Sequence, residues 1–281
     1  MEQDEIGTVL GIRGKVVAVA GGGGAKNGMG RATALLFAKL GAEVAVLDLN
    51  NEAAEVTRKE ISELAEREAS AWQVDVTDEA QVDQTIRGIV ERYGRIDVWA
   101  HVAGGHKGAT LIEDIPPAVW RANVELSLTS AFLCTRVALP IMKSQQKGKI
   151  VLVGSEAGLS HGYMSGADYA SAKGGLISFT RQLAFEAGPF NINVNAVVPG
   201  PTHEPDSERD RADGRLPKVP LQRFSRPGDL AQAIVFLASS WADMITGATL
   251  IVDGGLLIAR TDYETYVSKH KRPVSRGEGT I

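Results

Sequence analysis

The chain has 281 residues, of which 44% are hydrophobic and 23% are charged, with a formal net charge of -4. This ordinary globular balance argues against a strongly basic binder of nucleic acids or membrane surfaces, so no nucleic acid and no membrane is expected as a partner. The single cysteine, Cys134, excludes a disulfide within the chain, and no apolar run has the length of a signal peptide or membrane helix, so a cytoplasmic protein is predicted.

Short β-branched runs alternate with helical patterns from the start of the chain. The expected strands lie at 15–20, 43–49, 71–76, 96–104, 149–154, 192–200 and 249–255. The expected helices lie at 31–41, 52–68, 78–94, 117–146, 169–188 and 227–240. The strands are almost continuously apolar, which is typical of strands covered on both faces. Cys134 falls in the apolar pattern of a helix and is interpreted as a buried small side chain rather than a nucleophile.

The alternation predicts an α/β fold: a single-domain, Rossmann-like, doubly wound parallel sheet of about seven strands with helices on both faces. The domain is expected to span 13–256, between an N-terminal extension at 1–12 and a tail at 257–281. Residues 201–220 are charged, proline-rich and aperiodic, so they are expected to form either a lid over the substrate or a disordered segment. The tail is expected either to be disordered or to pack on a neighbouring subunit.

A glycine-rich turn joins the first expected strand to the first expected helix. From Ala20 to Gly30 the sequence reads AGGGGAKNGMG, with six glycines in eleven residues. Glycines let the backbone approach a pyrophosphate closely, and the following helix N-terminus offers free N–H groups and a positive dipole end. In a doubly wound sheet this is the nucleotide site, although a glycine turn alone also fits a plain flexible loop.

Asp48 strengthens the nucleotide interpretation, because it ends the second expected strand, eighteen residues after Gly30. An acidic residue there can accept hydrogen bonds from the adenosine ribose and repels a 2′-phosphate, which favours NAD over NADP. A turn or cap role is the alternative for Asp48. Asp75, at the end of the third expected strand, can similarly bind the adenine amino group or act as an ordinary turn residue.

A second chemical signal is Tyr169-Ala-Ser-Ala-Lys173, at the start of a predicted helix. A spacing of four places both side chains on one helical face. A nearby ammonium stabilises a phenolate and is expected to lower the tyrosine pKa, which lets the phenol exchange a proton with an alcohol or ketone oxygen. Ser155 lies fourteen residues earlier, after a predicted strand, and Asn123 lies in the long helix upstream.

With these residues in view, the chain resembles the short-chain dehydrogenase/reductase family over roughly residues 12–256. The resemblance rests on the glycine turn, Asp48, Asp-Val at 75–76, Ala-Gly at 103–104, Asn123, Ser155, Tyr169, Lys173, Pro-Gly-Pro-Thr at 199–202, Arg-Pro-Gly-Asp at 226–229 and Val-Asp-Gly-Gly at 252–255. Their occurrence together, in this order, is a far more specific signal than any one of them.

The resemblance implies a role for each candidate residue. Tyr169 would be the acid–base residue, Ser155 would polarise the substrate oxygen, and Lys173 would hold the nicotinamide ribose and tune Tyr169. Asn123 would hold a water that links Lys173 to solvent, and Thr202 would contact the nicotinamide carboxamide. The expected cofactor-binding residues are Gly21, Lys26, Asn27, Gly28, Met29, Gly30, Asp48, Leu49, Asp75, Val76, Val102, Ala103, Gly104, Tyr169, Lys173, Pro199, Gly200 and Thr202.

Two departures from the family pattern stand out. The family has Asn-Asn-Ala-Gly where this chain has His101-Val102-Ala103-Gly104, and His101 is expected to replace an asparagine hydrogen bond without being catalytic. The glycine turn is also three residues longer than Thr-Gly-x-x-x-Gly-x-Gly. Either the turn carries an insertion, which we favour, or the first strand is longer by three residues. Lys26 or Asn27 is expected to reach a phosphate, the alternative being that Lys26 points into water.

The function implied is an NAD-dependent oxidoreductase that interconverts a secondary alcohol and a ketone on a small polar or cyclic substrate. Candidate substrate residues are His106, Ser155, Glu156, His161, Tyr163 and His203, with His101, His106, His161 and His203 expected in loops beyond the strand ends. No metal is expected. The alternatives are an NADPH-dependent 3-oxoacyl-thioester reductase and a non-catalytic NAD(H)-sensing protein. The resemblance further implies a homotetramer, with subunit contacts on the outer faces of the helices at 117–146 and 169–188.

Overall fold

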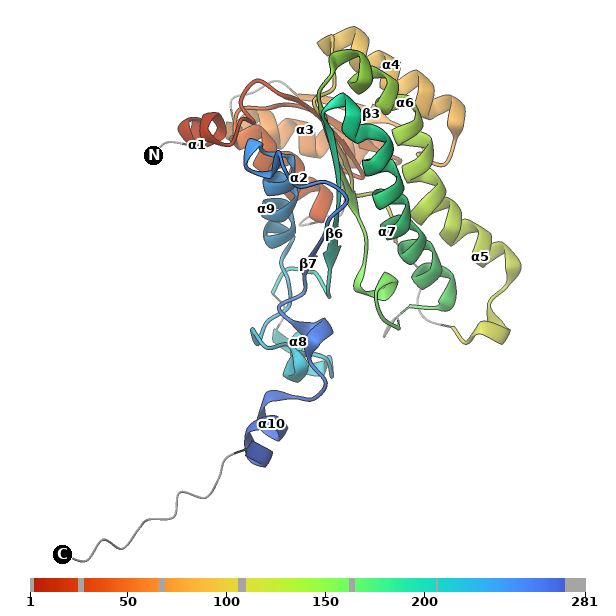
Figure 1. Cartoon of the computed structure of the whole chain (residues 1–281), viewed down its shortest axis with the longest axis vertical. Coiled ribbons are helices and arrows are strands. Elements are labelled where there is room, and N and C mark those ends of the chain that lie inside the picture. The colour runs from red at the N-terminus through yellow and green to blue at the C-terminus, as the bar shows by residue number, and fades with distance from the viewer. Residues whose placement is uncertain are drawn as a thin grey trace, which may run out of the picture.

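The computed structural model of the chain describes residues 3–24, 28–65, 69–105, 110–161, 165–205 and 207–270. Within them lies a parallel sheet of seven strands in the order β3-β2-β1-β4-β5-β6-β7 (Figure 1). The strands are β1 (Val16–Ala20), β2 (Glu43–Asp48), β3 (Ala69–Gln73), β4 (Val98–His101), β5 (Gly148–Val153), β6 (Ile192–Pro199) and β7 (Thr249–Val252). The predicted doubly wound sheet is therefore confirmed.

Helices cover both faces of the sheet (Figure 1). One face carries α2 (Met29–Lys39), α3 (Asn51–Ala65) and α9 (Pro227–Ala238), and the other carries α4 (Glu79–Tyr93), α6 (Ser130–Gln145) and α7 (Ala167–Ala187). Alternate residues of a strand point to opposite faces. Val17 and Val19 of β1 thus join one core, while Ala18 and Ala20 join the other. Two separate cores result, one on each face.

Some element boundaries differ from those expected. The third strand occupies Ala69–Gln73 instead of 71–76. Val74 and Val76 remain buried beyond the strand end, so the apolar pattern continues after the sheet pairing stops. The helix expected at 117–146 consists of α5 (Pro117–Val124), a π-helical turn at Glu125–Thr129, and α6.

Within the continuous helical stretch Pro117–Gln145, the most apolar 18-residue window has a mean hydropathy of 1.4, so by length and composition this helix could cross a membrane. By length and composition, this helix contradicts the expectation that no stretch of the chain is long and apolar enough to span a membrane. The buried side chains of α6, however, include Ala131, Cys134, Ala138 and Met142, which pack in the core beneath the sheet. Their spacing is that of an amphipathic helix covering one face of a sheet.

The segments outside the sheet contain short helices. The N-terminal extension forms α1 (Gln3–Val9), and the segment 201–220 contains α8 (Ser207–Ala212) and a 3-10 turn at Leu216–Lys218. The tail contains a 3-10 turn at Leu256–Ile258 and α10 (Tyr263–His270), which lies beyond α8 in Figure 1. Where these helices form, the disordered alternative is wrong, while the lid over the substrate and the packing of the tail on a neighbouring subunit stay predictions.

Candidate active site

The site lies where the strand order changes direction, between β1 and β4. The carbonyl oxygen of Ala20 accepts hydrogen bonds of 2.9 Å from the backbone N–H groups of both Val102 and Ala103. A Cβ atom on Gly21 would lie only 2.8 Å from the nitrogen of Ala103. The loops that follow β1 and β4 are therefore in direct contact. This is the position at which doubly wound sheets open a crevice for a ligand.

The glycine turn after β1 has the close packing that a nucleotide loop needs. Gly21 has φ of 81°, and a Cβ on Gly30 would lie 1.9 Å from the carbonyl oxygen of Gly21, so both positions require glycine. Helix α2 begins at Met29, and its N-cap Gly28 provides no side-chain cap, which leaves N–H groups available for an anion. The residues present therefore fit a bound pyrophosphate.

The length of β1 tests the two alignments of the glycine turn. Because β1 ends at Ala20, the alternative in which the strand is longer by three residues is wrong. Lys26 and Asn27 lie outside the described residues, so their expected phosphate contact stays a prediction.

Asp48 lies at the end of β2, facing the glycine turn. Its Oδ2 accepts hydrogen bonds from the backbone N–H groups of Gly23 (3.0 Å) and Gly24 (3.1 Å), and its Oδ1 accepts one from the N–H of Asn50 (3.0 Å). Asp48 therefore braces the turn, which is the turn role considered as its alternative.

A hollow of about 460 Å³ adjoins Asp48 at the glycine turn. It is lined by Gly23, Gly24, Arg31, Asn50, Glu52, Ala53 and Val56. Of these, Arg31 was not expected at the site, and its guanidinium forms an ion pair with Glu60.

Asp75, Val76 and Leu49 are the other residues expected to contact the adenosine. Oδ1 of Asp75 accepts hydrogen bonds from the N–H (2.9 Å) and the hydroxyl (2.6 Å) of Thr77, which is the turn role considered as its alternative. Val76 is buried and Leu49 is 65% exposed.

Ser155, Tyr169 and Lys173 meet at the carboxyl end of β5. The Tyr169 hydroxyl and Ser155 are hydrogen-bonded. The Nζ of Lys173 lies 5.8 Å from the centre of the Tyr169 ring and donates a hydrogen bond of 2.7 Å to the carbonyl oxygen of Val153. The three side chains that the sequence marks as catalytic candidates are therefore brought together.

The electrostatics of this group differ from the expectation in one respect. Burial raises the pKa of Tyr169, the hydrogen bond with Ser155 opposes the rise, and the charge of Glu156 adds to it. The expected lowering of the tyrosine pKa is thus wrong for this arrangement, because burial of the phenol is the largest influence and it raises the pKa. Burial lowers the pKa of Lys173 to about 8.

Two glycines fix the position of Lys173. A Cβ on Gly104 would lie 2.9 Å from the lysine Nζ, so the loop after β4 passes directly beside the ammonium. A Cβ on Gly158 would lie 2.6 Å from the carbonyl carbon of Lys173, so the turn after Ser155 rests on the backbone of α7. The turn at Glu156–Gly158 and helix α7 are therefore in close backbone contact.

Asn123 lies at the end of α5, immediately before the π-helical turn, and donates a hydrogen bond from Nδ2 to Oδ2 of Asp168. Oδ1 of Asp168 accepts a hydrogen bond of 2.9 Å from the backbone N–H of Tyr169. Asp168 is buried and links Asn123 to the active-site helix, a contact that no sequence pattern indicated. The water relay through Asn123 stays a prediction.

His101 is the last residue of β4 and is buried, so its expected position in a loop is wrong. Its Nε2 lies 3.0 Å from the hydroxyl oxygen of Ser130, which itself donates to the carbonyl of Leu126 at 2.6 Å. Nε2 therefore carries the proton and donates, and the buried Nδ1 has no partner among the described residues. Burial and the charge of Lys173 lower the pKa of His101 to about 3, so the imidazole is neutral.

The segment after β6 carries Pro199, Gly200 and Thr202. A Cβ on Gly200 would lie 3.0 Å from the Cβ of Asp253, so this segment packs against the end of β7. The hydroxyl of Thr202 donates a 3.0 Å hydrogen bond to the carbonyl of Gly200.

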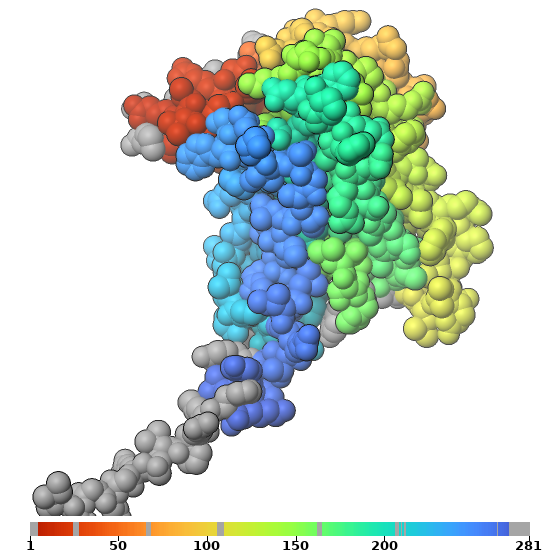
Figure 2. Space-filling model, in the orientation of Figure 1, coloured from red at the N-terminus to blue at the C-terminus, as the bar shows by residue number. Residues whose placement is uncertain are grey.

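Two of the expected substrate residues, His106 and Tyr163, lie outside the described residues. The Nε2 of His203 lies 3.3 Å from Asp210, so this histidine is engaged within its own segment. Glu156 and His161 line a cavity of about 170 Å³ with Ser160, Arg215, Lys218, Leu256, Leu257 and Ala259. Figure 2 shows the chain near 250–260 lying beside the 201–220 segment in this part of the molecule.

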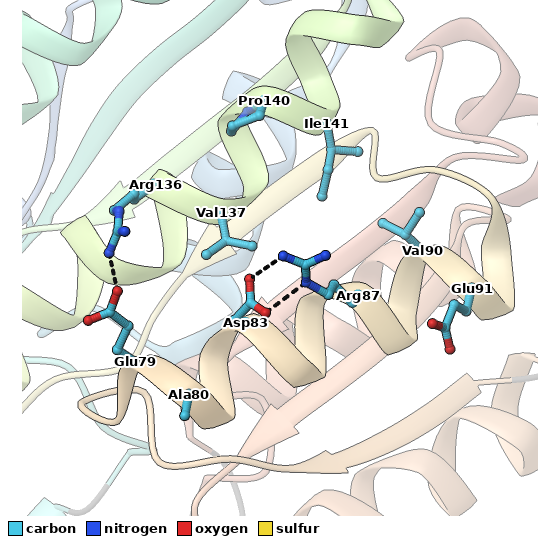
Figure 3. Close-up of a pocket in the computed structure, with 10 residues that line it drawn as sticks. All are labelled: Glu79, Ala80, Asp83, Arg87, Val90, Glu91, Arg136, Val137, Pro140 and Ile141. Atoms are coloured by element: carbon cyan, nitrogen blue, oxygen red, sulfur yellow. Dashed lines mark hydrogen bonds and ion pairs between the residues drawn. The ribbon is translucent and has the colours of Figure 1, made fainter.

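A larger groove of about 870 Å³ lies elsewhere, between α4 and α6 (Figure 3). Four of its five charged side chains form ion pairs, Asp83 with Arg87 and Glu79 with Arg136. It contains none of the predicted site residues. Within the described part of the chain, no group of three or more His, Cys, Asp or Glu residues is placed to hold a metal ion. Burial raises the pKa of Cys134 to about 12, in line with its interpretation as a core residue.

Known proteins resemble the chain along most of its length. Residues 23–257 match the family described as Enoyl-(Acyl carrier protein) reductase. A 3-oxoacyl-(acyl carrier protein) reductase of Thermotoga maritima is 36% identical over 88% of this chain and 99% of its own length, and a cyclohexanol dehydrogenase of a Rhodococcus species is 38% identical over 88% and 97%. The crystal structure of a Burkholderia xenovorans protein assigned to the short-chain dehydrogenases/reductases superposes with a TM-score of 0.83, at 34% identity over 89% of this chain and 99% of that one.

Proposed function

Since the chain belongs to the short-chain dehydrogenase/reductase family, we propose that it is an NAD-dependent oxidoreductase that interconverts a secondary alcohol and a ketone. The substrate would be small and polar or cyclic. The observation that carries the proposal is the meeting of Ser155, Tyr169 and Lys173 beside the loop that follows β4. When bound, the nicotinamide supplies or accepts the hydride.

The residues of this chain position and exchange the proton. Tyr169 gives its phenolic proton to the carbonyl oxygen during reduction and takes it back during oxidation. Ser155, which is hydrogen-bonded to Tyr169, holds the same substrate oxygen. Burial keeps the pKa of Tyr169 high, so a positive charge near the phenol is required to stabilise the phenolate that forms.

Lys173 is the source of that positive charge. Its pKa of about 8 means that most molecules carry the ammonium at neutral pH. Its hydrogen bond to Val153 and its contact with Gly104 hold the ammonium near the ring of Tyr169. Loss of the lysine proton above pH 8 is expected to reduce the reduction rate, because the phenolate then lacks its neighbouring charge.

The choice of NAD over NADP rests on Asp48. Its carboxylate lies at the end of β2 beside the glycine turn, where it would oppose a 2′-phosphate. Arg31 in the same hollow favours the alternative, an NADPH-dependent 3-oxoacyl-thioester reductase, and the Thermotoga relative is of that kind. The ion pair of Arg31 with Glu60 reduces the charge available to a phosphate, so we favour NAD.

The first experiment is a fluorescence titration of the protein with NADH and with NADPH. We expect the protein to bind NADH more tightly than NADPH. In Asp48→Ser the difference between the two affinities is expected to be smaller, because the carboxylate that repels the 2′-phosphate of NADPH is gone. Tighter binding of NADPH by the unaltered chain would instead favour the thioester reductase.

A non-catalytic NAD(H) sensor is the alternative of another class, and Tyr169→Phe separates it from an enzyme. Removing the phenolic oxygen is expected to lower the rate of NADH-dependent ketone reduction by a factor of about 100 or more, since general acid catalysis is lost. NADH affinity is expected to change less than threefold. Turnover that survives the substitution would contradict the proposed role of Tyr169, and a chain that binds NADH but reduces no ketone would support the sensor.

We further propose a cytoplasmic homotetramer. The outer faces of α6 and α7 carry Phe132, which is 46% exposed, and Phe185, which is 81% exposed. Large exposed apolar side chains on adjacent helices are typical of a subunit contact.

A further inference from the structure

Three segments that are distant in the sequence form one small cavity beyond Ser155. The turn after β5 contributes Glu156, Ser160 and His161, the 201–220 segment contributes Arg215 and Lys218, and the chain after β7 contributes Leu256, Leu257 and Ala259. The cavity measures about 170 Å³, which has room for one end of a small molecule. Glu156 lines the cavity and directly follows Ser155, and its charge raises the pKa of Tyr169, so the cavity lies near these candidate catalytic side chains.

The position of Glu156 is fixed relative to α7, the helix that carries Tyr169 and Lys173. It begins the 3-10 turn Glu156–Gly158, and this turn rests on the backbone of Lys173 through Gly158. Its side chain is 16% exposed, so the carboxylate is directed into the protein surface rather than out to bulk water. A group that the carboxylate binds would therefore lie at a set distance from Tyr169.

The cavity wall carries charges of both signs, with Glu156 on the acidic side and Arg215 and Lys218 on the basic side. Nη1 of Arg215 lies 3.4 Å from Oε1 of Glu156, while its Nη2 donates a 2.6 Å hydrogen bond to Asp213. The guanidinium also lies 5.8 Å from the ring centre of Phe224, which holds it in place. A ligand group with a net charge would meet a like charge at this wall. A hydroxyl group both donates and accepts, so it can bind to the carboxylate and to the cationic side chains together.

Part of the cavity lining is apolar, because it includes Leu256 and Leu257. A ring that carries hydroxyl groups has hydroxyls at its rim and C–H groups on its faces. Such a molecule matches a lining that combines polar side chains with aliphatic ones.

We propose that this cavity is a subsite for the hydroxyl-bearing end of a neutral cyclic substrate, and that Glu156 selects for that hydroxyl group. The inference rests on the proposed function and narrows it to hydroxylated cyclic ketones and the corresponding alcohols. The carboxylate of Glu156 accepts the hydrogen bond of a hydroxyl distant from the reacting carbon. The ring face rests on Leu256 and Leu257.

The test compares cyclohexanone with 4-hydroxycyclohexanone as substrates of NADH-dependent reduction. For the unaltered protein, kcat/KM is expected to be about tenfold or more higher for the hydroxylated ketone, since a site built around a hydrogen bond discriminates against the analogue that lacks it. In Glu156→Ala this ratio is expected to fall to about one, mainly through a higher KM for the hydroxylated ketone. Glu156→Gln, which retains an acceptor, is expected to give an intermediate ratio.

Glu204→Ala is the matched control, because Glu204 is an exposed carboxylate in the 201–220 segment that does not line the cavity. It is expected to keep the ratio of the unaltered protein. Equal ratios in the unaltered protein and in Glu156→Ala would overturn the proposal, and so would a preference of the unaltered protein for cyclohexanone.

A binding measurement separates this inference from the proposed function. Calorimetric titration of the NADH complex of Tyr169→Phe with the two ketones reports affinity without turnover. The subsite is supported if Tyr169→Phe binds 4-hydroxycyclohexanone more tightly than cyclohexanone and the double variant Tyr169→Phe, Glu156→Ala binds both equally. This result supports the subsite even if the proposed reaction fails. Equal affinity for both ketones overturns the subsite. Failure of the unaltered protein to reduce any ketone, in contrast, counts against the proposed function.

Discussion

At the scale of single residues, spacing along the chain decides which site residues can be predicted. Tyr169 and Lys173 share one face because four residues separate them on a helix, and Asp48 and Ser155 meet the site because parallel strands end at one edge. Asp168 and Arg215 were missed. Their contacts span 45 residues to Asn123 and 59 residues to Glu156, and no local pattern records such a contact.

His101 is a residue whose charge state should affect acid stability. Its pKa in the folded protein is about 3, whereas an unfolded histidine titrates near 6.5. Between these values the unfolded chain binds a proton that the folded chain does not, so stability is full above pH 6.5 and is lost as the pH falls. At pH 5 this residue is expected to cost about 2 kcal/mol of the free energy of unfolding.

Urea unfolding of the unaltered chain and of His101→Asn at pH 7 and pH 5 tests this expectation. On going from pH 7 to pH 5, His101→Asn should lose less free energy of unfolding than the unaltered chain, because asparagine does not titrate. His161→Asn is the control, since His161 is exposed, and it should behave as the unaltered chain does. An equal loss in the unaltered chain and His101→Asn would show that the imidazole is not held neutral by burial.

At the scale of elements, the strands were predictable because both faces of the sheet are covered and the strand sequences are therefore apolar throughout. The ends of elements were less predictable, because burial and hydrogen bonding do not stop at the same residue. The π-helical turn at Glu125–Thr129 could not be read from the sequence, since the apolar pattern runs through it without a glycine or proline. The hydroxyl of Ser130, which donates to the carbonyl of Leu126, is at this turn.

Disturbing the contact between the Glu156–Gly158 turn and α7 should lower kcat more than it lowers the affinity for NADH. In Gly158→Ala the new methyl group would meet the backbone of Lys173 and Gly174 at 2.6–2.7 Å, so the turn must move. Since Ser155 adjoins this turn, kcat is expected to fall about tenfold or more through misplacement of the substrate oxygen. NADH affinity should change less than threefold.

Stopped-flow rates and NADH titrations measure the two effects of Gly158→Ala separately. Gly188→Ala is a suitable control, because a Cβ there would meet nothing within 4 Å. A Gly158→Ala variant with an unchanged kcat would mean that the turn does not position Ser155.

At the scale of the whole molecule, the doubly wound architecture of the sheet was predictable, because it follows from the alternation of strands and helices. The convergence of the 201–220 segment with the chain after β7 was not, because neither segment has a periodic pattern. The proposed assembly also belongs to this scale, since it depends on a surface that only the folded helices present.

Phe185→Glu tests the assembly. The charge would be buried against a neighbouring subunit if α7 lies in a contact, so the variant is expected to dissociate into smaller species. Light scattering coupled to size-exclusion chromatography measures the mass. Leu64→Glu on α3, where the side chain is 56% exposed, is the control and should keep the mass of the unaltered protein. A Phe185→Glu variant of unchanged mass would exclude this face as a subunit contact.

The two cores of the sheet have a consequence for how such a protein diversifies. The glycine turn leads into α2, which packs in one core, whereas Tyr169 and Lys173 belong to α7, which packs in the other. Substitutions that repack one layer leave the other layer's contacts in place, because the strands separate them. A lineage can therefore acquire a new substrate through changes around α7 and the 201–220 segment while it inherits its nucleotide site unaltered.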